Sequence, residues 1–109
     1  MHELSITQSV VDTIAEATGG ATVLEVRLEI GRLSGVVPDS VRFCFELVCA
    51  GTALAGADLD IVEPPGVIRC RDCARVSELP DAFPLCPCGS ADVEVVGGRQ
   101  LKIKSVEVA

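Results

Sequence analysis

Two closely spaced pairs of cysteines limit the possible folds of this chain more than any other feature. Cys70 and Cys73 form a C-x2-C pair, and 12 residues separate it from a C-x-C pair formed by Cys86 and Cys88. Four thiolates arranged in a tetrahedron around one Zn²⁺ are a common use of such spacing. A zinc ion bound in this way contributes folding free energy directly. We therefore predict a structural zinc site, with a geometry distorted by the shortened second pair.

Proline and glycine residues set this cysteine-containing segment apart from the rest of the chain. Pro64-Pro65-Gly66 precedes it, and Gly97-Gly98 follows it. The residues between the two cysteine pairs that could build a core are Val76, Leu79, Phe83 and Leu85. So small an apolar area cannot offset a conformational entropy cost of about 1–2 kcal/mol per ordered residue. We therefore predict a zinc-ribbon-like, zinc-binding domain at residues 66–97, inserted into a domain formed by residues 1–65 and 98–109.

Other uses of the cysteines explain the pattern less well. Reduced surface cysteines would leave the inserted segment without any crosslink to stabilise it. A redox-active C-x2-C pair normally lies at the N-terminus of a helix that follows a strand. The remaining two of the six cysteines are Cys44 and Cys49. Because free cysteine is among the most buried residue types, we expect both in or near the core.

Hydrophobic periodicity divides the rest of the chain into two helices and three strands. Helical spacing predicts a helix over residues 4–17, which Gly19-Gly20 ends, and a second helix that starts near Pro38 and ends at Gly51. Alternation of apolar and polar residues predicts strands over residues 22–30, 58–63 and 100–108. We therefore expect an α/β fold with two helices on a three-stranded sheet, whose strand order the pattern leaves open.

The same periodicity assigns residues to the buried faces of these elements. In the first strand the expected buried residues are Leu24, Val26, Leu28 and Ile30. The second helix is expected to bury Val41, Cys44, Phe45 and Val48, with a face widened by Phe43 and Leu47. In the last strand one face carries Leu101 and Ile103, and the other carries Val106 and Val108. Either a β-bulge near Ser105 or partial burial of both faces accounts for this change.

Charge and composition argue against a protein that binds nucleic acid or an anionic membrane. The net charge is −7 and only 3% of the residues are aromatic, so electrostatic attraction and base-stacking surfaces are both lacking. No apolar run reaches the roughly 18 residues of a membrane span, and no secretory signal is visible. We therefore expect a cytoplasmic protein. A zinc-ribbon adaptor for nucleic acid or protein binding stays open, because the segment carries Arg69, Arg71 and Arg75.

His2 is the only histidine, and it lies next to the terminal amine of Met1. Taken alone, such a residue is expected to be solvated. However, the amine, the imidazole and the backbone amides of His2 and Glu3 together form a nitrogen-rich donor set. The amides are available because the first turn of a helix leaves its N–H groups unpaired. A planar nitrogen set suits Ni²⁺ or Cu²⁺ better than zinc. A cation at a helix N-terminus is disfavoured by about 0.3–1 kcal/mol, which the charge of Glu3 can offset, so the site would be exchangeable.

Several short motifs, in their order and spacing, resemble one known family over essentially the whole chain. The motifs are Met1-His2-Glu3-Leu4-Ser5, residues 30–36 with Pro38, Phe43-Cys44-Phe45-Glu46 followed by Gly51-Thr52, Cys70-x2-Cys73, residues 86–90 and residues 103–107. Together they are similar to the HypA/HybF family of hydrogenase maturation nickel chaperones.

This resemblance implies a non-enzymatic nickel metallochaperone. It implies that Met1, His2 and Glu3 carry nickel as cargo, and that the four cysteines hold structural zinc. It further implies delivery to a [NiFe]-hydrogenase large-subunit precursor, with a HypB-type nickel GTPase as the source and urease as a second target in some members. We expect a monomer or weak homodimer that binds no nucleic acid and no membrane. A thiol oxidoreductase is the third alternative, with Cys70 or Cys73 as its reactive group.

Overall fold

The computed structural model describes residues 3–109, so Met1 and His2 lie outside the described part of the chain. The helices and strands are α1 (Glu3–Thr18), β1 (Val23–Ile30), α2 (Pro38–Cys49), β2 (Asp58–Val62), β3 (Val67–Cys70), β4 (Val76–Glu78), β5 (Val93–Gly97) and β6 (Leu101–Val108). Within residues 3–109, no helix combines the length and the apolar character needed to cross a membrane.

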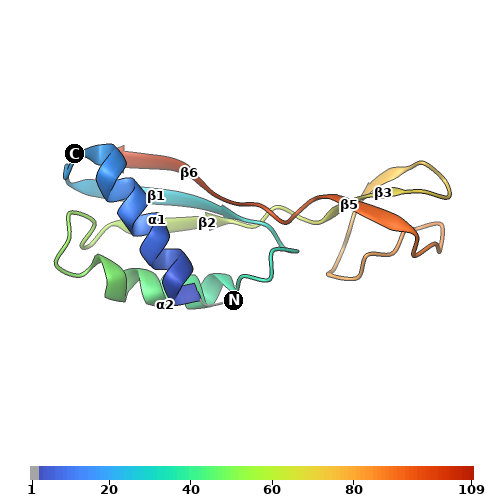
Figure 1. Cartoon of the computed structure of the whole chain (residues 1–109), viewed down its shortest axis with the longest axis horizontal. Helices are drawn as coiled ribbons and strands as arrows, with labels where there is room; N and C mark the ends of the chain where they lie inside the picture. Colours follow the sequence, from blue (N-terminus) through green and yellow to red (C-terminus); the bar gives the residue numbers. More distant parts are fainter. Residues whose placement is uncertain (1–2) are drawn as a thin grey trace.

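The larger part of the molecule is a three-stranded mixed sheet with both helices packed on one face (Figure 1). The strand order is β2-β1-β6, and β1 runs parallel to β2 and antiparallel to β6. One continuous core lies between the sheet and the helices, and includes Ile14, Val26, Leu28, Val41 and Phe45. The prediction of two helices on a three-stranded sheet is therefore confirmed.

Some of the expected buried residues are exposed. Leu24 is nearly half exposed, because an irregularity in the β1–β6 pairing between residues 23 and 25 gives the buried position to Val23 instead. Phe43 and Leu47 are 68% and 61% exposed. The prediction that they widen the apolar face of α2 is therefore wrong. The buried face is a narrow stripe of residues spaced four apart, made of Val41, Phe45 and Cys49.

Of the two alternatives for the last strand, the structure shows the bulge near Ser105. Ser105 pairs with Arg27 while Ile103 pairs with Leu28, so Lys104 is an extra residue in β6. Because one inserted residue reverses the alternation of side chains, Ile103 and Val106 can both pack against the core.

The inserted segment forms a second, antiparallel sheet with the order β4-β3-β5. Its small core consists of Ile68, Cys70, Leu79 and Cys86, with Leu33, Val93 and Val95 packed against it. Of the four residues expected to build this core, only Leu79 does so. Val76, Phe83 and Leu85 are more than half exposed, and within residues 3–109 no helix covers this segment. The segment is thus even poorer in apolar burial than the sequence indicates.

The two sheets lie end to end in a molecule that measures 52 × 22 × 17 Å (Figure 1). Where they meet, the loop after β1 crosses the two connections to the inserted segment and is hydrogen-bonded to both. The N–H of Gly31 donates to the carbonyl of Gln100 at 2.7 Å, and the N–H of Leu33 donates to that of Gly98 at 2.7 Å. The N–H of Arg32 donates to the carbonyl of Pro64 at 2.9 Å. This crossing fixes the smaller sheet to the larger one.

Candidate metal centres

The first cysteine pair lies in a tight turn between β3 and β4. The N–H of Cys70 donates to the carbonyl of Arg75 at 2.9 Å, and the N–H of Ala74 donates to the carbonyl of Cys70 at 2.9 Å. Ala74 has a φ of 62° and is the one non-glycine residue between 3 and 109 in the left-handed region. The turn therefore returns the chain within five residues and directs both cysteines of the pair to the same place.

The second cysteine pair repeats this turn with one residue fewer. The N–H of Cys86 donates to the carbonyl of Ser90 at 2.9 Å, and the N–H of Gly89 donates to the carbonyl of Cys86 at 2.8 Å. Gly89 takes the left-handed conformation here, with a φ of 95°. The residue that is missing from the C-x-C pair is thus absorbed by a shorter turn with the same pattern of hydrogen bonds.

These turns bring all four sulfur atoms to within 4.8 Å of one another. The Sγ atoms of Cys70 and Cys88 are 3.7 Å apart, and those of Cys73 and Cys86 are 3.6 Å apart. A tetrahedral zinc ion with bonds of about 2.3 Å would place its sulfur ligands about 3.8 Å apart. The four-cysteine cluster is therefore consistent with structural zinc.

Burial and nearby amides affect the two inner thiols in different ways. The backbone N–H of Cys73 donates to the Cys70 sulfur and lowers the pKa of that thiol. Burial opposes this effect and the Asp72 N–H adds to it, so that the pKa of Cys70 is about 7. The Cys88 N–H lowers the pKa of Cys86, but burial and the neighbouring thiols outweigh it and raise that pKa to about 12. Amides thus already point at sulfur atoms that carry negative charge when they bind a metal.

Polar side chains outside the cluster tie the two turns to each other. The Ser90 hydroxyl donates to the Asp72 carboxylate, and the Asp92 N–H donates to the Ser90 oxygen at 3.1 Å. The Arg71 guanidinium donates to the Asp92 carboxylate at 3.0 Å. Sequence reasoning missed these residues, although an aspartate inside one cysteine pair and a serine just after the other were visible.

The same contacts bear on the nucleic-acid alternative. Arg71 is paired with Asp92, and Arg69 lies 4.0 Å from Glu94. Two of the three arginines on which that alternative depended therefore face carboxylates of the same segment, which compensate their charge.

Replacing Ala74 with glycine should stabilise the zinc-bound protein by about 1 kcal/mol, because an L-residue in the left-handed region is strained and glycine is not. The check is urea denaturation at a fixed, saturating zinc concentration. Ala91→Gly is the matched control, since Ala91 is exposed in the loop before β5 and is not left-handed, and it should lose stability. Equal losses in both variants would contradict the strain at position 74.

The other predicted metal site falls only partly within the described chain. Met1 and His2 lie outside it, and Glu3 begins α1. The Glu3 carboxylate accepts a long hydrogen bond of 3.5 Å from the N–H of Val37, the residue that precedes α2 and has no side-chain cap of its own. Glu3 therefore brings the start of α1 to the start of α2.

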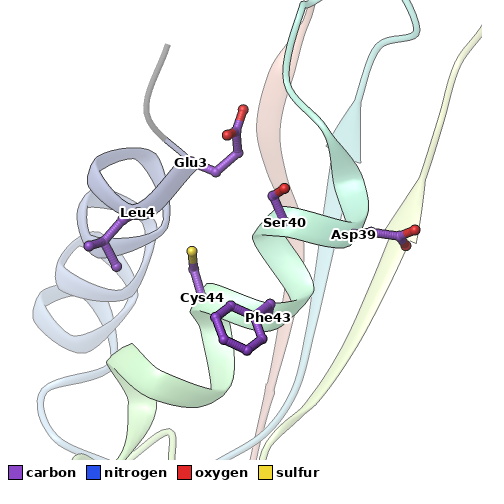
Figure 2. A pocket seen from close by; sticks show the side chains of 6 residues that line it. All are labelled: Glu3, Leu4, Asp39, Ser40, Phe43 and Cys44. Atoms are coloured by element: carbon purple, nitrogen blue, oxygen red, sulfur yellow. The ribbon is translucent and has the colours of Figure 1, made fainter.

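A cleft of about 490 Å³ lies between these two helix starts, lined by Glu3, Leu4, Asp39, Ser40, Phe43 and Cys44. In Figure 2 the Cys44 sulfur points into the space between the helices, whereas the Asp39 carboxylate points away from it. Cys44 is half-buried and Cys49 is buried, as the expected place in or near the core requires. Burial raises the pKa of Cys49 to about 11, so that thiol stays protonated at neutral pH.

Comparison with known proteins identifies the family. Residues 1–108 match the model of the HypA family, described as hydrogenase/urease nickel incorporation metallochaperones. A hydrogenase maturation factor HypA from Nostoc punctiforme is 46% identical over 108 residues, covering 99% of this chain and 96% of the relative. Another from Geobacter sulfurreducens is 49% identical over 109 residues, covering 99% of each chain.

A solved structure shows the same fold. The solution structure of the Ni metallochaperone HypA from Helicobacter pylori superposes with a TM-score of 0.66 at 24% sequence identity, covering 99% of this chain and 97% of the other. The fold, the four-cysteine cluster and the full-length sequence match all agree, and metallochaperones carry metal rather than catalyse a reaction. The chain therefore belongs to the HypA family of hydrogenase and urease nickel incorporation metallochaperones.

Proposed function

We propose that this protein binds Ni²⁺ through its N-terminus and delivers it during the maturation of a [NiFe]-hydrogenase. The observation that carries the proposal is the family match, which begins at residue 1 and so includes the Met1-His2-Glu3 sequence. The donors would be the terminal amine of Met1, the imidazole of His2 and the backbone amides of His2 and Glu3. Such a set of nitrogen atoms suits the planar coordination that Ni²⁺ favours.

The surroundings of Glu3 support this assignment. Glu3 is the first residue of α1, so the amides of the first turn have no helical carbonyl to bind. A metal ion there meets the positive end of the helix dipole, and a carboxylate nearby reduces that cost. Glu3 supplies one carboxylate, which is held between the two helix starts by the Val37 N–H. The proposed site is therefore exposed, moderate in affinity and open to exchange.

The proposal assigns a different role to the four-cysteine cluster. Cys70, Cys73, Cys86 and Cys88 would hold Zn²⁺ permanently and so supply the folding free energy that the small core lacks. On this basis residues 66–97 form the zinc-binding domain, and residues 1–65 with 98–109 form the nickel-binding domain. Because free thiols persist in a reducing compartment, we propose that the protein works in the cytoplasm.

The proposed partners follow from the direction of nickel transfer. A HypB-type nickel GTPase would be the source, and a [NiFe]-hydrogenase large-subunit precursor the recipient. The names of the relatives, hydrogenase maturation factors, support the second of these, and the family description includes urease as another destination. Neither partner is expected to require nucleic acid or a membrane surface.

Replacing His2 with alanine should abolish nickel binding and leave zinc in place. Elemental analysis of untagged protein after nickel loading and desalting should give about one nickel per chain, falling at least tenfold in the variant, because the imidazole is the one side-chain nitrogen of the set. A tag that blocks the terminal amine should have the same effect. Gln8→Ala, an exposed change in the same helix, is the control and should retain full nickel. Nickel binding with unchanged affinity in both the His2→Ala and the tagged protein would refute the assignment.

A further inference from the structure

The strand β6 has an open edge. It is the last strand in the order β2-β1-β6, and within residues 3–109 no strand pairs with its outer side. The N–H of Gly31 donates to the carbonyl of Gln100. This bond shows which residues of β6 turn their backbone groups toward β1 and which turn them away. Since hydrogen-bonded residues alternate along such a pair, the backbone groups of Leu101 and Ile103 point away from β1. They are therefore available to a further strand.

A groove runs along this open edge, between it and the helix α1. Its volume is about 290 Å³, and it is lined by Ile6, Ser9, Val10 and Thr13 from α1 and by Leu101, Lys102 and Ile103 from β6. An extended peptide that pairs with an edge strand directs every second side chain to the same face. Here that face is the groove, whose walls are mainly aliphatic. An edge strand beside a helix is an arrangement that binds peptides by strand addition.

The opposite face of β6 has the only lysines of the chain, Lys102 and Lys104. Lys102 lies beside Glu29 on the side of the sheet away from the helices, and Lys104 is the exposed bulge residue, in a protein whose net charge is −7. The Lys102 ammonium is 3.2 Å from the carboxylate of Glu29. Lys104 is exposed, and no carboxylate of the described residues lies within salt-bridge distance of it. A strand added beside β6 would meet the uncompensated ammonium of Lys104 and would pair best if it presented a carboxylate there.

We propose that the β6 edge binds an extended segment of another polypeptide as a fourth strand, and that this segment alternates apolar and acidic residues. Its apolar side chains occupy the groove beside α1, and its carboxylates face Lys102 and Lys104. Antiparallel pairing of β6 with β6 of a second copy, in the register centred on Ile103, would oppose Lys102 to Lys104, which is unfavourable. Pairing with β2 of a second copy would leave one edge strand unpaired at each end of the dimer, so further copies could add and form an open-ended polymer. The surface is distinct from both metal sites, so neither metal is needed for its occupation.

The test is an NMR titration of the full-length, zinc-bound protein with two synthetic seven-residue peptides. One alternates glutamate and valine, and the other alternates lysine and valine. We expect the glutamate peptide to bind at least tenfold more tightly and to shift the amide signals of residues 101–104 and of the α1 residues that line the groove. Ser9→Arg should weaken this binding at least tenfold by filling the groove, whereas Gln8→Arg, on the opposite side of α1, should leave it unchanged. Lys104→Glu should remove the preference for the glutamate peptide.

Three results would overturn the proposal. The first is equal affinity, or no measurable affinity, for both peptides. The second is binding that Ser9→Arg leaves intact, because the groove would then not be the site. The third is self-association of the peptide-free protein that Lys104→Glu abolishes, because the β6 edge would then pair with the acidic β2 edge of a second copy of the chain. Binding that survives Gln8→Arg and fails in Ser9→Arg supports it.

Discussion

Cys70→Ser or Cys86→Ser should abolish zinc binding and unfold residues 66–97, while the helices and the larger sheet stay folded. Cys70 and Cys86 are buried in a core whose other fully buried residues are only Ile68 and Leu79. Removing one of four ligands from a structural zinc site forfeits much of a binding free energy of about 10–16 kcal/mol. The small core cannot replace that amount. Serine in place of the buried sulfur also leaves a polar group without its partners.

Elemental analysis and NMR together check this result. Zinc per chain should fall from about one to below a tenth, and the dispersed amide signals of β3, β4 and β5 should collapse, because the metal supplies the folding free energy of the segment. Cys44→Ser is the control, since Cys44 is half-buried and far from the cluster, and it should keep zinc and the dispersed signals. A folded β3–β4–β5 sheet in zinc-free protein would contradict the account.

Gly31→Ala should lower the free energy of unfolding of the whole protein. The Cβ of an alanine there would lie 2.2 Å from the carbonyl oxygen of Gly98 and 2.4 Å from its carbon. Both are backbone atoms, held by the hydrogen bonds of the crossing, so neither can turn aside. Forcing them apart should cost about 3 kcal/mol or more in the free energy of unfolding, which is the range of severe steric substitutions.

Denaturant unfolding of zinc-bound Gly31→Ala measures this cost. Gly51→Ala is the control, because Gly51 has open space where the Cβ would be, and its φ of 77° is the strain that Gly31, which is not left-handed, does not share. The free energy of unfolding of this control should fall by only about 1 kcal/mol, because alanine is strained in the left-handed region. If Gly31→Ala loses no more stability than Gly51→Ala, the close approach to Gly98 does not decide the effect, and the crossing is looser than the distances indicate.

The elements of the fold followed from the sequence because each has a strong local signal. Gly19-Gly20, Pro38 and Gly51 mark the helix ends, and alternation marks the strands, so the elements could be predicted, with a bulge in β6 as one of two alternatives. Strand order could not, since it depends on contacts between segments far apart in the chain. Burial on α2 was overestimated at Phe43 and Leu47, because a pattern shows which residues are apolar but not how wide a face the sheet covers.

The candidate site divides along similar lines. The four cysteines and the N-terminal donors carry their chemistry in residue type and spacing, which a sequence displays directly. The turn that absorbs the shortened pair depends instead on a left-handed Gly89 and on its hydrogen bond to Cys86, and neither can be seen in a spacing. The role of Glu3 at the start of α2 was also hidden, because Val37 lies 34 residues further along the chain.

Leu33 makes the core of the smaller sheet depend on the larger part of the protein. It belongs by sequence to the loop between β1 and α2, but its side chain packs against the core that holds Cys70 and Cys86. A fragment cut out at the two connections would therefore lose one wall of its interior along with the loop that braces it. The core around the four cysteines is therefore complete only in the intact chain, where the loop after β1 supplies Leu33.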